Sequence, residues 1–284
     1  MVLDKKLPAP LSKFLVYTCA GHESNLSRWR KSRDDFDLFV VYYGDQTGQY
    51  FHESDYYISQ KGGKFPNFYK VYSQWRKIFD SYQVVMIADD DLIFTSSNLS
   101  VFFKIFETYN LSLAQPSFDP RGKASHRVGK VRPFSLMRYT NFVEVTCPAF
   151  DSYSLALFMS VYDPELNCQG VDYWFSGLIA KVKKRIAIVD AVVCLNPRDE
   201  TKINGREIDT LFDSEERERQ WQIAVGKYQL EEIIPVTFSS ERYPISFRAF
   251  YLMCRHLFFK LEAQLNKLIR RKLVLPLNRY LDKK

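Results

Sequence analysis

The sequence predicts an α/β protein built on a mainly parallel sheet with helices on both faces. Short apolar runs rich in β-branched residues, the pattern of buried parallel strands, alternate with segments of helical periodicity. One such run, residues 84–88, stops at three consecutive carboxylates, Asp89, Asp90 and Asp91. Polar groups at the carboxyl end of a buried strand are typical of ligand sites in open α/β sheets.

Length and composition indicate one large globular domain with an appendage. The 284 residues are 46% hydrophobic and 16% aromatic, which is far from the composition of disordered chains. No stretch reaches the roughly 18 apolar residues of a membrane-spanning helix. The early apolar run, residues 14–20, is better explained as a first strand than as a signal peptide.

The five cysteines form no Cys-x-x-Cys or Cys/His metal spacing and lie mostly inside apolar runs. We therefore expect reduced, buried thiols, which are typical of a cytoplasmic protein.

The net charge of +7 lies entirely in the C-terminal part. Residues 241–284 contain 11 Lys and Arg against 3 Asp and Glu, whereas residues 1–240 contain 29 against 30. A nearly neutral body argues against a nucleic-acid groove, and a basic tail indicates an anionic partner surface. We therefore predict a main domain over residues 1–240 and a separate tail over residues 241–284.

The first two strands are predicted over residues 14–20 and 36–43, with a helix over residues 26–31 between them. This order is typical of nucleotide-binding sheets. Thr18 and Asp45 then lie at strand ends on the same rim as the three carboxylates. Asp45 is suited to accept hydrogen bonds from a base or ribose, although Gly-Asp after a strand is also ordinary turn chemistry.

A basic loop with two glycines precedes a helix that Pro66 is placed to open. Lys64, at the start of this helix, could reach a phosphate group, and the alternative is a solvated loop lysine.

The three carboxylates outline a metal site. Because side chains alternate along an extended segment, Asp89 and Asp91 point to one side and Asp90 to the other. This gives two hard oxygen ligands with one spacer, and the mutual repulsion of adjacent carboxylates favours a bound cation. The alternative is a solvated acidic turn that caps the next element.

The middle of the chain continues with a helix that ends near Tyr109, a strand over residues 111–116 and a loop over residues 118–132. The loop is long enough to form a functional flap over the site. A strand over residues 142–148 follows and carries Glu144, an acid inside a strand, which needs a partner or a task.

Helices over residues 152–162 and 172–181, a strand over residues 185–193 and a charged helix that starts at Asp213 complete the domain. Asp172 opens its helix, where an Asp is first of all an N-cap. A carboxylate at a helix mouth beside two aromatic residues also suits a general base.

Several separate motifs occur in a fixed order: Gly63-Lys64-Phe65-Pro66-Asn67, Asp89-Asp90-Asp91-Leu92, Gln115-Pro116-Ser117, Arg138-Tyr139-Thr140-Asn141-Phe142-Val143-Glu144, Gly170-Val171-Asp172 and Ile188-Val189-Asp190-Ala191. Across residues 14–198 they resemble a family of largely uncharacterised, predicted GT-A-type glycosyltransferases. The resemblance implies a GT-A-like, mainly parallel sheet between helices, a nucleotide-sugar donor and a divalent metal, Mn²⁺ or Mg²⁺.

The resemblance also implies residue roles. Asp89 and Asp91 would hold the metal, and Lys64 would help it to neutralise the departing diphosphate. The further donor contacts that we assign are Thr18, Asp45 and Asp90. Where the family pattern ends in a motif that resembles Val-Val-His, this chain has Val193-Cys194-Leu195-Asn196. The resemblance therefore identifies no third protein ligand for the metal.

For the chemical step, Asp172 resembles the helix-opening acid that deprotonates the acceptor hydroxyl in many inverting GT-A enzymes, and Glu144 is the second candidate for this base. The expected activity is sugar transfer to a glycan or lipid-linked acceptor in polysaccharide or glycoconjugate biosynthesis. Two other classes stay open, a nucleotidyltransferase and a non-catalytic, membrane-docked glycan-binding module. A Gly-rich phosphate loop of the kind that nucleotidyltransferases carry near the N-terminus is absent from the sequence.

The tail is predicted to form a basic amphipathic helix. Apolar residues recur at three- and four-residue steps over residues 247–268, with Lys and Arg on the flanks and at the far end. We expect peripheral attachment to the cytoplasmic face of a membrane through anionic lipid. The alternative is a helix packed on the main domain or a dimer contact.

Overall fold

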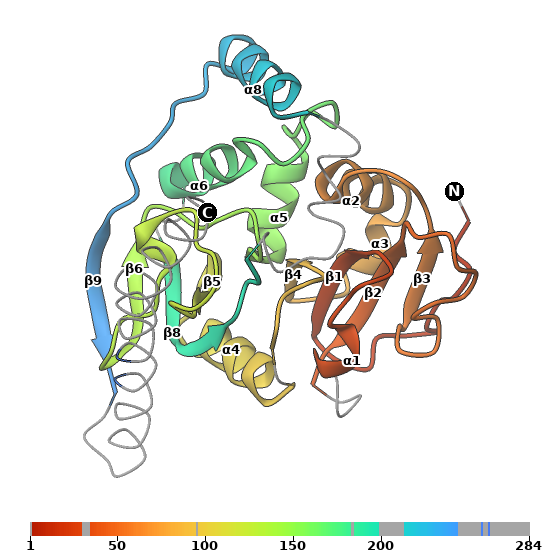
Figure 1. Cartoon of the computed structure of the whole chain (residues 1–284), viewed down its shortest axis with the longest axis horizontal. Coiled ribbons are helices and arrows are strands. Elements are labelled where there is room, and N and C mark those ends of the chain that lie inside the picture. Colours follow the sequence, from red (N-terminus) through yellow and green to blue (C-terminus); the bar gives the residue numbers. More distant parts are fainter. Residues whose placement is uncertain are drawn as a thin grey trace, which may run out of the picture.

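The computed structural model describes residues 2–29, 35–94, 96–182, 185–198 and 213–243, together with Leu257 and Leu261. Within these residues the strands form one nine-stranded sheet in the order β3-β2-β1-β4-β7-β5-β8-β6-β9 (Figure 1). The strands are β1 Phe14–Ala20, β2 Asp37–Tyr42, β3 Tyr56–Ser59, β4 Val84–Asp89, β5 Leu113–Phe118, β6 Ser135–Thr140, β7 Ala149–Asp151, β8 Ile186–Cys194 and β9 Thr237–Arg242. The helices are α1 Leu26–Trp29, α2 Lys64–Gln74, α3 Arg76–Phe79, α4 Ser96–Thr108, α5 Ser152–Met159, α6 Val171–Val182 and α8 Ser214–Tyr228.

The sheet is mainly parallel, as predicted. β1 pairs in parallel with β2 and β4, β2 with β3, and β5 with β8. β7 runs antiparallel between β4 and β5, and β6 runs antiparallel between β8 and β9. β4 therefore lies near the middle of the sheet, and the carboxylates at its end lie where neighbouring loops converge.

Helices cover both faces of the sheet, so the central strands are buried along almost their whole length and are mainly apolar. In β1, Leu15 and Tyr17 face a core that also contains residues of α2, α5 and α6. Phe14 and Val16 face the opposite core, which contains residues of α1 and α4. The apolar runs that predicted β1, β2 and β4 reflect this burial on two sides.

The strand predicted over residues 142–148 is wrong. These residues form an irregular segment with a turn at Val145 and Thr146, and only residues 149–151 pair as β7. Besides β7, the sequence analysis did not identify β3, β6 and β9, which complete the sheet.

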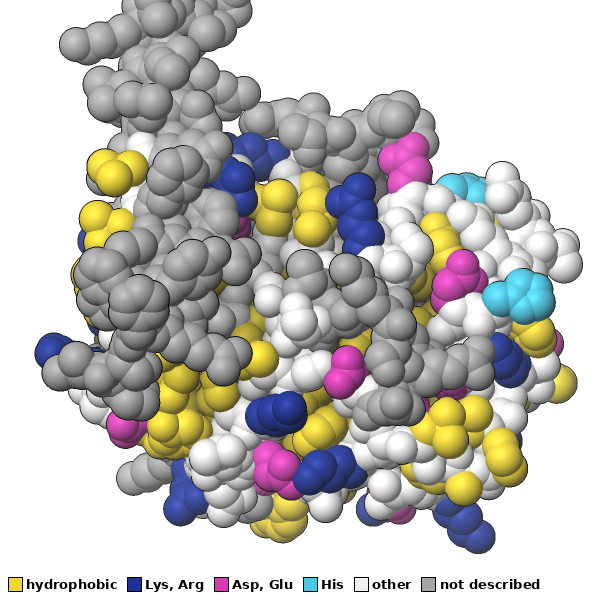
Figure 2. Space-filling view, turned by 90° about the horizontal axis from the view of Figure 1, so that it is seen from below, with side chains coloured by type: hydrophobic (Ala, Val, Ile, Leu, Met, Phe, Trp, Pro, Cys, Tyr) yellow, Lys and Arg dark blue, Asp and Glu magenta, His cyan; other side chains and the backbone are white. Residues whose placement is uncertain are grey.

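The main domain reaches further than residue 240, since β9 pairs with β6 through Arg242. Beyond residue 243, the predicted amphipathic helix lies outside the described residues, apart from Leu257 and Leu261. None of the helices in the described ranges combines the length and hydrophobicity that crossing a bilayer requires. On the face drawn in Figure 2, described side chains of both charges are interspersed, in agreement with the nearly neutral charge of residues 1–240.

Candidate active site

Asp89 ends β4, and Asp90 and Asp91 follow it in a turn that the loop between β1 and α1 holds in place. The Gly21 amide donates to Asp90 Oδ2 at 2.9 Å, and the Asn25 amide donates to the Asp90 carbonyl at 2.8 Å. The Asn25 side chain donates to the Asp91 carbonyl at 2.6 Å. Asp89 instead contacts Lys64 of α2. Asp89 and Asp90 thus take partners from different elements.

The electrostatics of the turn favour a cation. Burial raises the pKa of Asp90 to about 8, and the charges of Asp91 and Asp89 act in the same direction, whereas the hydrogen bond from Gly21 lowers it. A positive charge beside the turn would relieve this repulsion and stabilise the ionised carboxylates. The hard oxygen donors and their mutual repulsion therefore fit a divalent metal.

Lys64 is a buried member of the site. Its ammonium donates to Asp89 Oδ1 at 2.5 Å, to the Val145 carbonyl at 2.7 Å and to the Thr146 carbonyl at 3.2 Å. Burial lowers the pKa of Lys64, but the charge of Asp89 and its hydrogen bond outweigh this effect, and the pKa is raised. The ammonium stays charged, and the alternative of a solvated loop lysine is wrong.

The irregular segment before β7 connects the carboxylate turn to the start of α6. The Thr146 carbonyl accepts both Lys64 and the Asp89 amide, the latter at 2.9 Å. The Val145 amide donates to Asp172 Oδ2 at 3.4 Å, while its carbonyl accepts Lys64. The Val145 peptide thus bonds to Lys64 and Asp172 rather than to a neighbouring strand, whereas the Thr146 and Pro148 carbonyls accept amides of β4.

Asp172 is the second residue of α6, which begins at Val171, so its interpretation as an N-cap is wrong. Its side chain is 7% exposed, and Oδ1 accepts the Tyr173 amide at 3.1 Å. Burial raises the pKa of Asp172 to about 6, against the lowering effect of the Val145 and Tyr173 amides and of the Lys64 charge. A carboxylate with such a pKa is ionised at neutral pH and is more basic than an exposed Asp.

Glu144 is almost completely buried and has a different task. Its two carboxylate oxygens accept the backbone amides of Ser125 and His126, each at 3.1 Å. Burial raises the pKa of Glu144 to about 7, the two amides lower it, and the charge of Asp172 raises it. A Cβ on Gly129 would lie 2.5 Å from Glu144 Oε1, so a glycine makes room for the carboxylate. Glu144 anchors the loop between β5 and β6.

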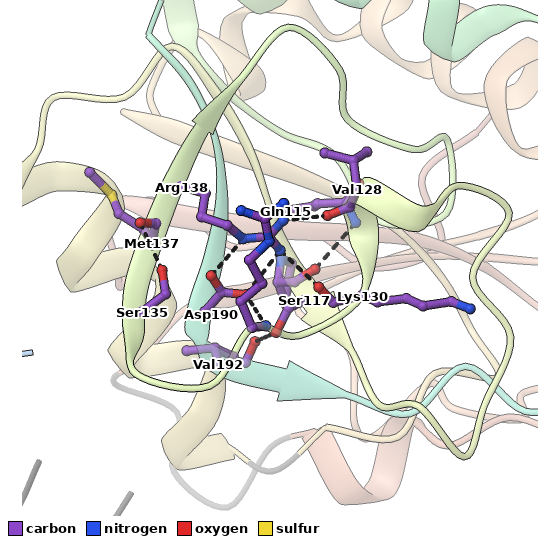
Figure 3. A network of polar contacts seen from close by, with 11 residues as sticks. Gln115, Ser117, Val128, Lys130, Ser135, Met137, Arg138, Asp190 and Val192 are labelled. Carbon is purple, nitrogen blue, oxygen red and sulfur yellow. Dashed lines mark hydrogen bonds and ion pairs between the residues drawn. The ribbon is translucent and has the colours of Figure 1, made fainter. Parts of the chain in front are cut away.

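A buried ion pair anchors the same loop from a second direction (Figure 3). Arg138 donates to Asp190 through Nε at 2.7 Å and Nη2 at 3.0 Å, and both side chains are fully buried. Arg138 also donates to the carbonyls of Val128 and Lys130, and the Arg132 amide donates to Asp190. The predicted flap is therefore held at several backbone positions. Arg138 and Asp190 both lie in the motifs quoted above, but the sequence analysis assigned them no role.

Two residues assigned to donor binding lie in contrasting places. Thr18 is fully buried within β1, and its hydroxyl donates to the Cys19 carbonyl at 3.4 Å, so it lies in the core rather than on the rim. Asp45 follows β2 on the surface and accepts Lys61 at 2.8 Å, a contact that lowers its pKa. Its amide donates to His22. Asp45 is thus accessible at the predicted rim, and Thr18 is not.

Comparison with solved structures identifies the fold. The structure of S. aureus TarS 1-349 in complex with UDP-GlcNAc matches with a TM-score of 0.52 and 11% identity over 92% of this chain and 76% of that chain. The structure of GalNAc-T7 with UDP, GalNAc and Mn²⁺ matches with a TM-score of 0.51 and 10% identity over 75% of this chain and 48% of that chain. The fold is of the GT-A type. This chain spans less than half of the GalNAc-T7 chain, and 60% of the TarS chain in a UDP complex that also matches. No protein-family model and no curated protein matches the sequence.

In this GT-A-type fold, the segment after β8 lies beside the carboxylate turn. Leu195 and Ile93 exchange backbone hydrogen bonds of 2.9 and 3.3 Å. This is the region in which the resemblance would place a histidine, and the chain has Cys194, Leu195 and Asn196 there instead. Across the described ranges, no three His, Cys, Asp or Glu side chains are grouped so that they could hold a metal.

Proposed function

We propose that this chain is a metal-dependent glycosyltransferase that moves a sugar from a nucleotide-sugar donor to a glycan or lipid-linked acceptor with inversion of configuration. One observation carries the proposal: Lys64 and the Val145 peptide connect the carboxylate turn at the end of β4 to a buried carboxylate, Asp172. A GT-A-type fold surrounds this connection. The complexes of TarS with UDP-GlcNAc and of GalNAc-T7 with UDP, GalNAc and Mn²⁺ support the proposed donor class and metal.

The carboxylate turn is the proposed donor end of the site. Asp89 and Asp91 would hold Mn²⁺ or Mg²⁺, which supplies positive charge to the leaving diphosphate. The Gly21 amide fixes the orientation of Asp90 within the turn. On the rim, the exposed carboxylate of Asp45 would accept hydrogen bonds from a ribose or base.

Asp172 is the proposed general base. Two backbone amides orient its carboxylate, and burial keeps it basic. It would remove the proton of the acceptor hydroxyl as the hydroxyl oxygen attacks the anomeric carbon of the donor. In the transition state of this displacement the sugar resembles an oxocarbenium ion. Glu144 is less suited to this task, because both of its oxygens already hold the loop between β5 and β6. A retaining reaction would remove this role for Asp172.

We further propose that the basic tail attaches the enzyme to the cytoplasmic face of a membrane, where a lipid-linked acceptor would be met. The excess of Lys and Arg over residues 241–284 supports this proposal, since each cation near an anionic leaflet contributes about 1 kcal/mol.

Hydrolysis of nucleotide sugars tests the proposed activity. The full chain is incubated with UDP-, GDP- and CMP-linked sugars, with Mn²⁺ or with a chelator. We expect slow, metal-dependent release of free sugar and nucleotide from one donor class. Asp91→Asn should abolish both this release and the metal-dependent donor binding measured by calorimetry, whereas Asp80→Asn, an exposed carboxylate outside the site, should change neither. With pyrophosphate added, release of a nucleoside triphosphate and a sugar 1-phosphate would instead indicate a nucleotidyltransferase. Absence of hydrolysis and of donor binding with every donor would contradict the proposal.

A further inference from the structure

The buried ammonium of Lys64 is a cation already present at the metal-binding turn. Its three N–H groups match three acceptors, namely Asp89 Oδ1 and the carbonyls of Val145 and Thr146. Lys64 is 7% exposed, whereas the Asp89 side chain is 42% exposed. The pair therefore has a buried positive end and a carboxylate that reaches solvent, from which a metal ion would approach.

We infer that Lys64 is a resident counter-cation that competes with the divalent metal for Asp89 and so lowers the metal affinity of the turn. The inference rests on the proposed function and concerns the affinity of its metal site. Since Lys64 acts through Asp89, it is a positioning residue. Two roles considered above, phosphate binding and solvation on a loop, do not use the contact with Asp89, which is the shortest of the three.

Charge decides the direction of the effect. With Lys64 present, the pair of Lys64 and Asp89 carries no net charge, and the attraction for a cation comes mainly from the remainder of the turn, above all from Asp91. A neutral residue at position 64 restores a full negative charge at Asp89 and removes the repulsion between the ammonium and the metal. For an ion about 5 Å away, this repulsion changes the affinity by about tenfold even with the screening of water. Damage to the fold could only weaken binding, so tighter binding distinguishes competition from a structural role.

The test titrates Mn²⁺ alone into the full chain and measures free Mn²⁺ by electron paramagnetic resonance. Lys64→Met keeps the apolar stem and removes the charge. Lys70→Met makes the same change at an exposed position of the same helix and is the matched control. We expect Lys64→Met to bind Mn²⁺ about tenfold tighter than the natural chain, by the same estimate, and Lys70→Met to bind as the natural chain does.

A pair of variants covers the case in which Lys64→Met does not fold. Asp89→Asn leaves Lys64 charged beside the turn and should weaken Mn²⁺ binding strongly. Adding Lys64→Met to Asp89→Asn removes the buried charge and should recover about tenfold of that loss. Mn²⁺ affinity that is unchanged or weaker in folded Lys64→Met, or no recovery in the double variant, overturns the inference. Absence of Mn²⁺ binding in both the natural chain and folded Lys64→Met overturns it as well. The proposed sugar-transfer activity is tested separately by donor hydrolysis. The failure of the inference about Lys64 can therefore be distinguished from the failure of the proposed activity.

Discussion

Replacing Asp172 with Asn should make the protein more stable at pH 8 and much less active. The carboxylate is 7% exposed, and burial raises its pKa from the ordinary 3.8 to about 6. The unfolded chain therefore loses this proton at lower pH than the folded chain. The protonated Asp172 contributes its full share to the free energy of unfolding below about pH 4. This contribution decreases as the pH rises towards 6 and is absent at higher pH.

The magnitude follows from the pKa difference. Each pKa unit corresponds to about 1.4 kcal/mol, so the ionised Asp172 destabilises the folded state by about 3 kcal/mol above pH 6. Asn removes this penalty. Its side-chain NH₂ group, however, would replace one of the two oxygens that accept the backbone amides of Val145 and Tyr173, and the lost hydrogen bond costs about 1 kcal/mol. A net gain of about 2 kcal/mol is expected at pH 8, equivalent to a rise of a few degrees in the melting temperature. The gain should shrink towards pH 5.

Calorimetric melting and donor turnover, each measured from pH 5 to pH 8, check this expectation. Turnover should fall by about 10²- to 10⁴-fold, the range for a lost general base, and the limb of the pH profile near pH 6 should disappear. Asp151→Asn changes an acid that caps α5 away from the site, through a bond to the Ser154 amide, and should alter neither turnover nor its pH profile. A lower melting temperature at pH 8 with normal turnover would refute the reasoning and leave Asp172 with a purely structural role.

Three further changes test other parts of the structure. Asp190→Asn leaves the fully buried Arg138 without its counter-charge and should cost about 3–5 kcal/mol in urea unfolding; a loss below about 1 kcal/mol would contradict the importance of this ion pair. Gly170→Ala forces a side chain into a residue with φ of +74° and places its Cβ 2.1 Å from the Trp221 ring. We expect it to cost at least about 2 kcal/mol in the same assay and to lower turnover, because it displaces the start of α6. A chain that ends at Tyr243 should lose the salt-sensitive sedimentation with anionic liposomes expected of the full chain; equal sedimentation of both chains would rule out the tail as the anchor.

The sequence predicted best those elements whose environment is uniform. β1 was predicted over its observed residues, and β4 and its carboxylate end were placed correctly. A strand that is buried on both faces has a run of apolar residues, and this run can be recognised without knowledge of the rest of the fold. The start of α8 was also predicted, and Asp213 caps it by accepting the Glu216 amide at 2.7 Å. A local sequence pattern thus predicts an element correctly when neighbouring residues determine its structure.

The sequence analysis failed where partners distant in the sequence decide the structure. Residues 142–148 have apolar residues that suggest a strand, but their backbone groups bond to Lys64, Gln115 and Ser176 instead. Thr18 was assigned to the rim although the predicted strand, like β1, continues to Ala20, and the side chain is fully buried within that strand. The role of Arg138 was missed for a related reason, since its partner Asp190 lies 52 residues away.

The contact between Lys64 and the turn before β7 has a consequence for folding kinetics. The ammonium reaches the Val145 and Thr146 carbonyls across sequence separations of 81 and 82 residues. Contacts over such distances require the closure of a long loop, and they form late compared with local contacts. During synthesis, a chain that has not yet reached residue 145 contains all three carboxylates and Lys64 but none of the carbonyls that hold the ammonium. In refolding experiments, burial of the Lys64 ammonium should therefore follow the slow docking of the second half of the sheet rather than the earlier assembly of β1, β2 and β4.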